Sequence, residues 1–174
     1  MVNANTESNK CNFTVSVDYK VGTSTGISAS DRAKSIAAIA DYSSVAEDFM
    51  RPGHIFPLRA KKGGVLVRAG HTEAATDLAK LAGCSPVGVI CEIARDDGEM
   101  MKGDELMEFA IKNDLKIITI KDLIEYRHRR ENLIKLVAES LLPTEYGDFD
   151  MKIYKTTIDE SEHIALVMGK WKSN

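Results

Sequence analysis

Residues 65–93 read VLVRAGHTEAATDLAKLAGCSPVGVICEI, and this stretch decides the predicted fold. Its apolar opening, residues 65–68, predicts a short strand. Thr72 is a suitable N-cap for the alanine-rich helix that follows, and Gly83 stands where a glycine commonly ends a helix. The apolar run at 87–93 then predicts a buried strand. A strand, a helix and a second strand in succession are typical of an α/β protein.

The segments on either side continue this alternation. Alternating apolar and polar residues predict a half-buried strand at 13–19, and Ser30 is expected to cap a helix at 31–41 with Asp31 in its first turn. The other expected elements are loops at 21–29 and 41–64, helices at 104–113 and 121–139, a strand at 115–120, and strands at 149–156 and 163–169 around the turn Asp159-Glu160-Ser161. We therefore predict an α/β fold, a mixed sheet layered with helices. A boundary near 130–143 precedes a short β segment that has no core of its own.

The composition fits one ordinary domain and part of a second. The chain has 174 residues, of which 44% are hydrophobic and 28% charged. A net charge of -3 does not favour a nucleic-acid partner. No apolar run approaches the roughly 18 residues of a membrane span, and the first residues do not resemble a secretory signal. The three cysteines have no metal-type spacing, so we expect a cytoplasmic protein with reduced thiols and no membrane partner.

The turn Arg68-Ala69-Gly70-His71-Thr72 is the strongest candidate for a binding site. A helix N-terminus presents free N–H groups and the positive end of the helix dipole, so it attracts anions. Gly70 lets the backbone approach a ligand, and Arg68 can hold a phosphate or carboxylate through two parallel hydrogen bonds. His71 can bind a metal or transfer a proton near neutral pH. The alternative is an ordinary strand-to-helix turn with a capping threonine and a surface arginine.

Two further residues are candidates for acid–base chemistry. His54 follows Arg51-Pro52-Gly53, a turn that would hold the imidazole in place, although a solvent-exposed loop histidine is the simpler explanation. Glu92 lies within the apolar run at 87–93, where burial of an unpaired carboxylate is costly. It therefore needs a partner, a metal, or a strand end that faces a cleft. The alternative is an edge position with the side chain in water.

Several of these motifs together are similar to a known family. RPGHIFPLRAKKGGVLVRAGHTEAATDLAKLAG at 51–83, followed by GVICEI at 88–93, resembles 3,4-dihydroxy-2-butanone 4-phosphate synthase of riboflavin biosynthesis. TGISASDRAKSI and KIITIKDLIEYR extend the resemblance to about residues 8–128. The resemblance implies the fold of that family, a lyase activity, and a homodimer with active sites near the subunit interface.

The resemblance also implies a reaction and a set of site residues. The family converts D-ribulose 5-phosphate to L-3,4-dihydroxy-2-butanone 4-phosphate and formate, with magnesium or manganese as the metal. By motif, His54 and Glu92 match the two essential catalytic positions, and Glu92 also contacts substrate. The stretch from Arg68 to Thr72 holds the phosphate end of the substrate, and His71 is a metal ligand. An anion-binding helix start, a proton carrier and a carboxylate suit the enolisation of a sugar phosphate, whose enediolate a divalent metal would stabilise.

The C-terminal part resembles a second family. AESLLPTEYGDFDMKIYKTTIDESEHIALVMGK, at 138–170, is similar to the opening of GTP cyclohydrolase II, which suggests the order of a bifunctional enzyme. The cysteine cluster that binds zinc in that family is not among these residues, so we predict no cyclohydrolase activity for this chain. The expected organisation is a synthase domain at 1–130, then a linker and the opening of a cyclohydrolase-like domain at 131–174.

The front of the chain departs from the synthase pattern. That family begins with a strand and a loop like Asp-Arg-Glu-Asn-Glu-Gly-Asp, whose Glu binds the metal, and residues 1–20 contain no such loop. MVNANTES is similar to the middle of the family domain, so we expect a chain truncated at both ends, with impaired catalysis. The alternative function is a non-catalytic fragment or pseudoenzyme that retains only a phosphate-binding loop. An unrelated phosphosugar isomerase would require the motif matches to be coincidental.

Overall fold

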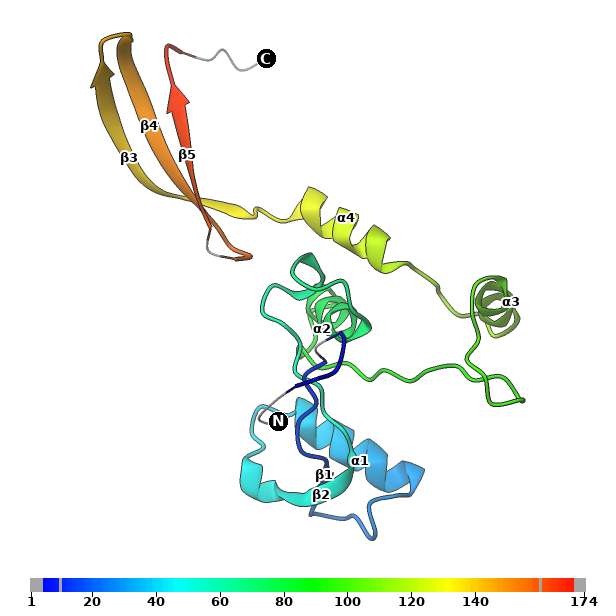
Figure 1. Cartoon of the computed structure of the whole chain (residues 1–174). Helices are drawn as coiled ribbons and strands as arrows, with labels where there is room; N and C mark the ends of the chain where they lie inside the picture. Colours follow the sequence, from blue (N-terminus) through cyan, green and yellow to red (C-terminus); the bar gives the residue numbers. More distant parts are fainter. Residues whose placement is uncertain (1–4, 10, 160, 171–174) are drawn as a thin grey trace. The chain divides into compact units, whose positions relative to one another are not determined.

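A computed structural model of the chain describes residues 5–9, 11–159 and 161–170 (Figure 1). It contains both helices and small antiparallel sheets, which confirms the predicted mixed α/β class. The chain divides into two compact units, residues 1–120 and 121–174. The elements are β1 (Val17–Tyr19), α1 (Ala29–Ala40), the 3-10 helix η1 (Ala46–Asp48), β2 (Phe49–Ile55), the 3-10 helix η2 (Gly64–Leu66), α2 (His71–Leu81), α3 (Asp104–Lys112), α4 (Ile120–Arg130), β3 (Ile134–Thr144), β4 (Gly147–Thr156) and β5 (Glu162–Val167).

The first sheet pairs β1 with β2 in antiparallel register. Asp18 lies opposite Met50, and an irregularity in the register separates Val17 from Asp18. The prediction of a loop throughout 41–64 is therefore wrong, because this segment contains β2. Gly53 makes the close crossing of the two strands possible: a Cβ atom on it would lie 2.1 Å from the carbonyl carbon of Val17. Of the predicted strand at 13–19, only the last three residues form β1.

Helix α1 packs against this sheet and begins earlier than predicted. Its N-cap is Ser28 and not Ser30, and the Ser28 hydroxyl oxygen accepts a hydrogen bond of 3.0 Å from the backbone N–H of Asp31. One turn further along the helix, the hydroxyl oxygen of Ser35 accepts a hydrogen bond of 2.9 Å from the backbone N–H of Tyr19. A buried helix side chain thereby holds the end of β1.

The segment before α2 is a 3-10 helix and not the strand predicted at 65–68. Gly63 and Gly64 have φ angles of 94° and 65°, which an extended strand cannot accommodate. The buried carboxylate of Asp77 then accepts a hydrogen bond of 2.8 Å from the Val65 N–H. Helix α2 begins at His71, with Gly70 and not Thr72 at its N-cap. Gly83, with a φ of 74°, follows the end of the helix as predicted.

Two segments of the first unit were predicted as buried strands and are neither buried nor strands. Residues 87–93 and 115–120 form no strand in the described chain; the first segment precedes α3 along the chain and the second follows it (Figure 1). Val89 is 65% exposed and Ile118 is 56% exposed. β-branched residues favour strands, but no described strand pairs with either segment.

The second unit contains a three-stranded antiparallel sheet in the order β3-β4-β5. The helix predicted at 121–139 ends at Arg130, and its expected last turns belong to β3. The strands predicted at 149–156 and 163–169 correspond to β4 and β5. In the turn between them, the predicted Glu160 lies outside the described residues.

Buried polar groups are prominent in the described chain. The buried hydrophobic residues are Ala38, Val65, Ala110 and Leu123, and the buried polar residues are Asp18, Asp31, Ser35, Glu73 and Asp77. Four of these five polar residues are carboxylates, each of which needs hydrogen-bond donors when it leaves water. Hydrogen bonding to buried carboxylates therefore helps to organise the first unit. Among the described helices, we find none with the length and apolar character to cross a membrane.

Candidate active site

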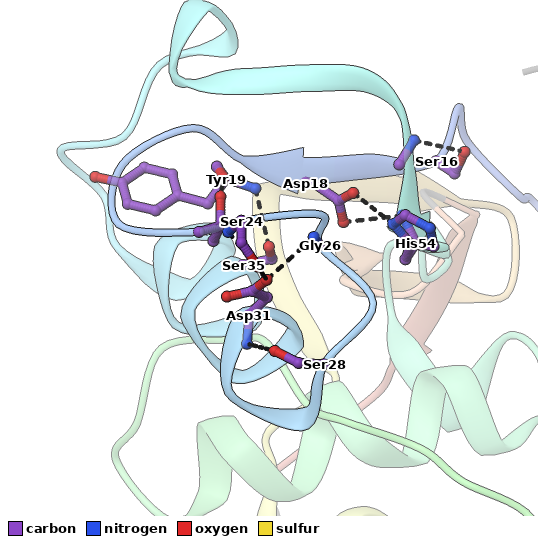
Figure 2. Close-up of polar contacts among 11 residues, drawn as sticks. Ser16, Asp18, Tyr19, Ser24, Gly26, Ser28, Asp31, Ser35 and His54 are labelled. Atoms are coloured by element: carbon purple, nitrogen blue, oxygen red, sulfur yellow. Dashed lines mark hydrogen bonds and ion pairs between the residues drawn. The ribbon is translucent and has the colours of Figure 1, made fainter.

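A histidine–carboxylate pair joins the two strands of the first sheet (Figure 2). Nδ1 of His54, on β2, lies 2.7 Å from Oδ2 of Asp18, on β1. The backbone N–H of His54 donates to the other carboxylate oxygen, Oδ1, at 2.9 Å. The Asp18 side chain is 4% exposed, whereas the His54 side chain is 41% exposed. Asp18 thus holds both the backbone and the ring of a histidine that solvent can still reach.

The charge state of Asp18 determines which ring nitrogen of His54 is the donor. Burial raises the pKa of the Asp18 carboxyl, but the hydrogen bonds from the His54 backbone and ring outweigh this effect, so the pKa lies below 3.8. The group is therefore ionised at neutral pH and can only accept hydrogen bonds. A neutral His54 ring then carries its proton on Nδ1, and its Nε2 is the basic nitrogen.

The loop from Gly22 to Ser28 covers this pair, and a second buried carboxylate fixes it in place. Asp31 Oδ2 accepts hydrogen bonds from the Ser24 hydroxyl at 2.8 Å, from the Ser24 N–H at 3.0 Å and from the Gly26 N–H at 3.1 Å. The bonds from Ser24 are the main reason why the Asp31 pKa lies below its ordinary value. Gly26 leaves no room for a side chain: a Cβ atom there would lie 2.1 Å from Asp18 Oδ2 and 2.8 Å from His54 Nδ1.

Arg68 is anchored by internal contacts at the start of α2. Its Nη1 lies 2.6 Å from Oε2 of Glu73, a side chain that is 1% exposed. Its Nε donates to the carbonyl oxygen of Asn9 at 3.1 Å, and its Nη2 lies 2.9 Å from Sγ of Cys11. The hydrogen bond that Arg68 donates to Glu73 raises the Arg68 pKa above its ordinary value. Arg68 therefore joins the N-terminal segment, the turn and α2 into one assembly.

The turn itself has the geometry of an anion site. Helix α2 starts at His71, which is exposed, and its first intrahelical bond runs from the Ala74 N–H to the Gly70 carbonyl. In the described part of the chain, the N–H groups of His71, Thr72 and Glu73 donate to no acceptor. Ala69 precedes the N-cap. These N–H groups can therefore receive an anion, which the helix dipole favours. That residues 68–72 bind substrate remains a prediction.

Glu92 stands apart from the other candidates. The prediction that it lies in a buried strand is wrong, because its side chain is exposed on a segment without strand partners. The cost of burying a carboxylate therefore does not apply here. No hydrogen bond described for this chain joins Glu92 to His54 or to residues 68–72. Its catalytic role stays a prediction.

The described residues do not form a metal site by themselves. No group of three or more His, Cys, Asp or Glu side chains among them is arranged to hold a metal ion. The predicted ligand His71 is a single exposed imidazole, whereas magnesium takes several oxygen ligands. Within the described chain, His71 therefore supplies at most one of the several ligands that magnesium or manganese would need.

Sequence reasoning missed Asp18 and Glu73, the two carboxylates that hold His54 and Arg68. In the alternating pattern at 13–19, Asp18 occupies a polar position, which predicts exposure to water. Its partner His54 is 36 residues away in the sequence, so no local signal connects them. Glu73 follows Thr72 in the first turn of a helix, where an acidic residue is common for dipole reasons alone.

Comparison with known proteins identifies the class and the family to which this chain belongs. The family model of 3,4-dihydroxy-2-butanone 4-phosphate synthase matches residues 1–126, and that of GTP cyclohydrolase II matches residues 135–174. The first match covers well over half of the chain, and with the fold it defines a synthase-type protein. The chain belongs to the 3,4-dihydroxy-2-butanone 4-phosphate synthase family.

Individual proteins agree with this family. The riboflavin biosynthesis protein RibBA of Endomicrobium trichonymphae is 53% identical over 99% of this chain, and the match covers 43% of the relative. The solved structure of RibBX, a two-domain synthase from A. baumannii, matches 97% of this chain and 50% of its own at 44% identity and a TM-score of 0.83. A synthase solved in complex with two magnesium ions matches 75% of this chain and 66% of its own at 39% identity and a TM-score of 0.68. The chain thus spans about 43% of that RibBA relative.

Proposed function

We propose that this chain carries the base and the phosphate-binding turn of a 3,4-dihydroxy-2-butanone 4-phosphate synthase. The substrate is D-ribulose 5-phosphate, and the products are L-3,4-dihydroxy-2-butanone 4-phosphate and formate. Together the two products contain all the atoms of the substrate, so the reaction needs no redox partner and no net water. The observation that carries the proposal is the anchored pair of His54 and Asp18, in a segment that matches the synthase family.

The proposed first step is removal of a proton from the carbon next to the substrate's carbonyl group. Nε2 of His54 is the basic nitrogen, because Nδ1–H is directed to the ionised Asp18 carboxylate. When Nε2 takes the proton, the ring becomes a cation, and the buried carboxylate 2.7 Å from Nδ1 stabilises it. His54 is then the catalytic base, and Asp18 is a positioning residue that acts through it.

The phosphate end of the substrate is assigned to the start of α2. The N–H groups of His71 and Thr72 and the Thr72 hydroxyl are the donors that an anion would meet there. Arg68 is already hydrogen-bonded to Glu73, so its role in this proposal is to hold the turn and to add positive charge near the phosphate. This is a different use of Arg68 from direct two-point binding.

Glu92 and the metal belong to the proposal as the family motif implies them. Glu92 would act on the substrate as the second catalytic group, and His71 would contribute one ligand to magnesium or manganese, which supplies Lewis-acid stabilisation of an enediolate when bound. Because the described residues form no three-ligand cluster, we derive no step through the metal. The proposed organisation remains a synthase domain at 1–130 and a cyclohydrolase-like opening at 131–174, in a homodimer.

Formate release from D-ribulose 5-phosphate in the presence of magnesium tests this function. We expect release by the parent chain, a loss of at least 100-fold in His54→Ala, and little change in the matched control His163→Ala, which removes an exposed histidine from β5. Asp18→Asn should shift the pH profile of the rate. If the role of Asp18 were purely structural, the substitution would not shift this profile. Equal activity of the parent and His54→Ala would overturn the assignment of the base.

A second candidate, a non-catalytic protein that binds sugar phosphates, is favoured by the absence of a three-ligand metal cluster in the described residues. It predicts binding without turnover. Calorimetric titration with D-ribulose 5-phosphate distinguishes the two functions: binding that depends on the start of α2, with no formate from the parent chain, would select this candidate. Formate release that is lost in His54→Ala would exclude it.

A further inference from the structure

Three polar side chains of α1 hold the loop from Gly22 to Ser28 and the end of β1. Asp31, Lys34 and Ser35 are spaced i, i+3 and i+4, so they lie on one face of the helix. Asp31 accepts hydrogen bonds from the loop, Lys34 Nζ donates to a carbonyl oxygen of the loop, and Ser35 accepts a hydrogen bond from the end of β1. Asp31 and Ser35 are buried, at positions where a helix more commonly places apolar side chains. This face of α1 therefore fixes the loop and the strand by hydrogen bonds.

Capping of α1 does not account for the bonds of the Asp31 carboxylate. Ser28 is the N-cap, and its hydroxyl oxygen already accepts the hydrogen bond from the Asp31 N–H. In a capping box, the side chain at the position of Asp31 returns to the N–H of the N-cap residue itself. Oδ2 of Asp31 instead accepts from Ser24 and Gly26, which precede the cap. The carboxylate therefore acts on the loop, beyond what the start of the helix requires.

Gly26 connects the Asp31 carboxylate to the histidine–carboxylate pair (Figure 2). The atoms that a Cβ on Gly26 would meet first include Asp18 Oδ2 and His54 Nδ1, which are the two atoms of the hydrogen bond between the strands. By holding the Gly26 N–H, Asp31 keeps the backbone of this residue against that bond. A hydrogen bond to a charged group is stronger where water is excluded, because water would compete for both partners.

We propose that Asp31 is a positioning residue for the base: it holds Gly26 against the hydrogen bond between Asp18 and His54, and thereby keeps water from that bond and fixes the imidazole ring. The hydrogen bonds from Ser24 keep the Asp31 pKa below its ordinary value, so the group is ionised at neutral pH and remains an acceptor. The inference rests on the proposed function, since Asp31 influences the reaction only through His54. A small displacement of a catalytic group lowers a rate steeply, which gives such a residue a measurable effect.

Exchange of the His54 Nδ1 proton with water, measured by nitrogen-15 NMR on the full chain, tests the proposal. We expect it to be at least 10-fold faster in Asp31→Asn. A smaller increase is expected in Ser24→Ala, which removes only the hydroxyl donor. The matched control is Asp41→Asn at the other end of α1. The Asp41 carboxylate also accepts bonds from the N–H and the hydroxyl of a serine, Ser43, at 2.9 and 2.8 Å, but that serine lies outside the loop. Its substitution should leave the exchange unchanged.

Ser28→Ala separates positioning from a general loss of stability. This variant removes the N-cap hydroxyl of α1 and keeps the bonds between Asp31 and the loop. We expect it to destabilise the chain without accelerating exchange of the His54 Nδ1 proton. Equal acceleration in Ser28→Ala and Asp31→Asn would assign the effect to the helix and overturn the proposal.

Formate release supplies the second readout. The turnover number should fall at least 10-fold in Asp31→Asn and stay unchanged in Asp41→Asn. An unchanged turnover number in Asp31→Asn, or unchanged exchange of the His54 Nδ1 proton in that variant, would overturn the proposal. Absence of formate from the parent chain would count against the proposed function alone, because the exchange measurement needs no turnover and still decides whether Asp31 positions the ring.

Discussion

Arg68 and Glu73 form an ion pair of 2.6 Å in which the carboxylate is 1% exposed and the arginine side chain 21% exposed. Glu73 also accepts a hydrogen bond of 2.9 Å from the Lys61 N–H, so its two oxygens link the turn, the preceding loop and α2. Glu73→Gln keeps the size of the side chain but removes its charge. We expect it to lower the free energy of unfolding by about 2 kcal/mol, a typical value for a hydrogen bond to a charged group.

Chemical unfolding followed by far-UV circular dichroism measures this loss. The matched control is Glu108→Gln, the same change at an exposed position of α3, which should stay within about 0.5 kcal/mol of the parent. Equal stability of the two variants would mean that the buried pair contributes nothing that a neutral amide cannot replace.

Substitution of Gly26 and of Gly98 by alanine tests how closely the loop at 22–28 packs on His54. Their φ angles are 89° and 90°, so an alanine at either position meets the same backbone strain, about 1–2 kcal/mol. A Cβ atom on Gly98 has nothing within 4 Å, whereas one on Gly26 would collide with Asp18 and His54. Gly26→Ala should therefore cost roughly 1–3 kcal/mol more than Gly98→Ala.

The ring resonances of His54 provide a second measurement of the same substitution. Gly26→Ala should shift them, because the Asp18 carboxylate must move to admit the new methyl group. Gly98→Ala should leave them unchanged. Unperturbed His54 resonances in Gly26→Ala would contradict the close packing of the loop on the pair.

The two buried aspartates make the stability of the first unit depend on pH. Folding lowers the pKa of Asp18 and of Asp31 below 3.8. Their stabilising contribution is therefore complete only well above pH 3.8, and it is lost as the pH falls through 3.8 and then through the lower pKa values of the folded state. We expect the free energy of unfolding to decrease between about pH 5 and pH 2.

Asp31→Asn isolates one of these two contributions. The variant should be less stable than the parent at neutral pH, and the difference should shrink toward low pH. Asp96→Asn, at an exposed position in a turn, is the control and should run parallel to the parent. A stability difference that is the same at every pH would exclude ionised Asp31 as the cause.

The sheet of the second unit should protect its central strand. β4 is paired on both sides, with β3 through contacts such as Glu139 opposite Lys152 and with β5 through Tyr154 opposite His163. Three strands are enough for a sheet to gain independent stability, which an isolated hairpin lacks. We expect amide exchange in β4 at least 10-fold slower than in residues 88–92. Comparable rates would mean that the strands do not remain paired in solution.

The sequence predicted helices and terminal strands well where the signals are local. α3 was expected at 104–113 and is found at Asp104–Lys112, and β4 and β5 lie close to their expected positions. The predictions were wrong where pairing with a distant strand determines the secondary structure of a segment. The run at 134–139 continues the apolar pattern of the preceding helix, but it pairs with β4 and becomes part of β3.

In the candidate site, too, local patterns were recognised in the sequence and contacts between distant residues were not. The start of α2 was recognisable because a glycine, a histidine and a threonine next to an amphipathic helix are a local pattern. Asp18 was not, because its importance comes from His54 on the neighbouring strand. The burial expected for Glu92 was wrong for the same physical reason: burial of a strand depends on the partners that cover it, and residues 87–93 have none among the described elements.

The exposed apolar side chains have a calorimetric consequence. The heat-capacity increase on unfolding is proportional to the apolar surface that becomes exposed to water, and in the described first unit much of that surface is in water already. Globular proteins typically show a heat-capacity increase of about 12–15 cal/mol/K per residue on unfolding. We expect a smaller increase for this unit. Its stability should accordingly vary with temperature along an unusually flat curve.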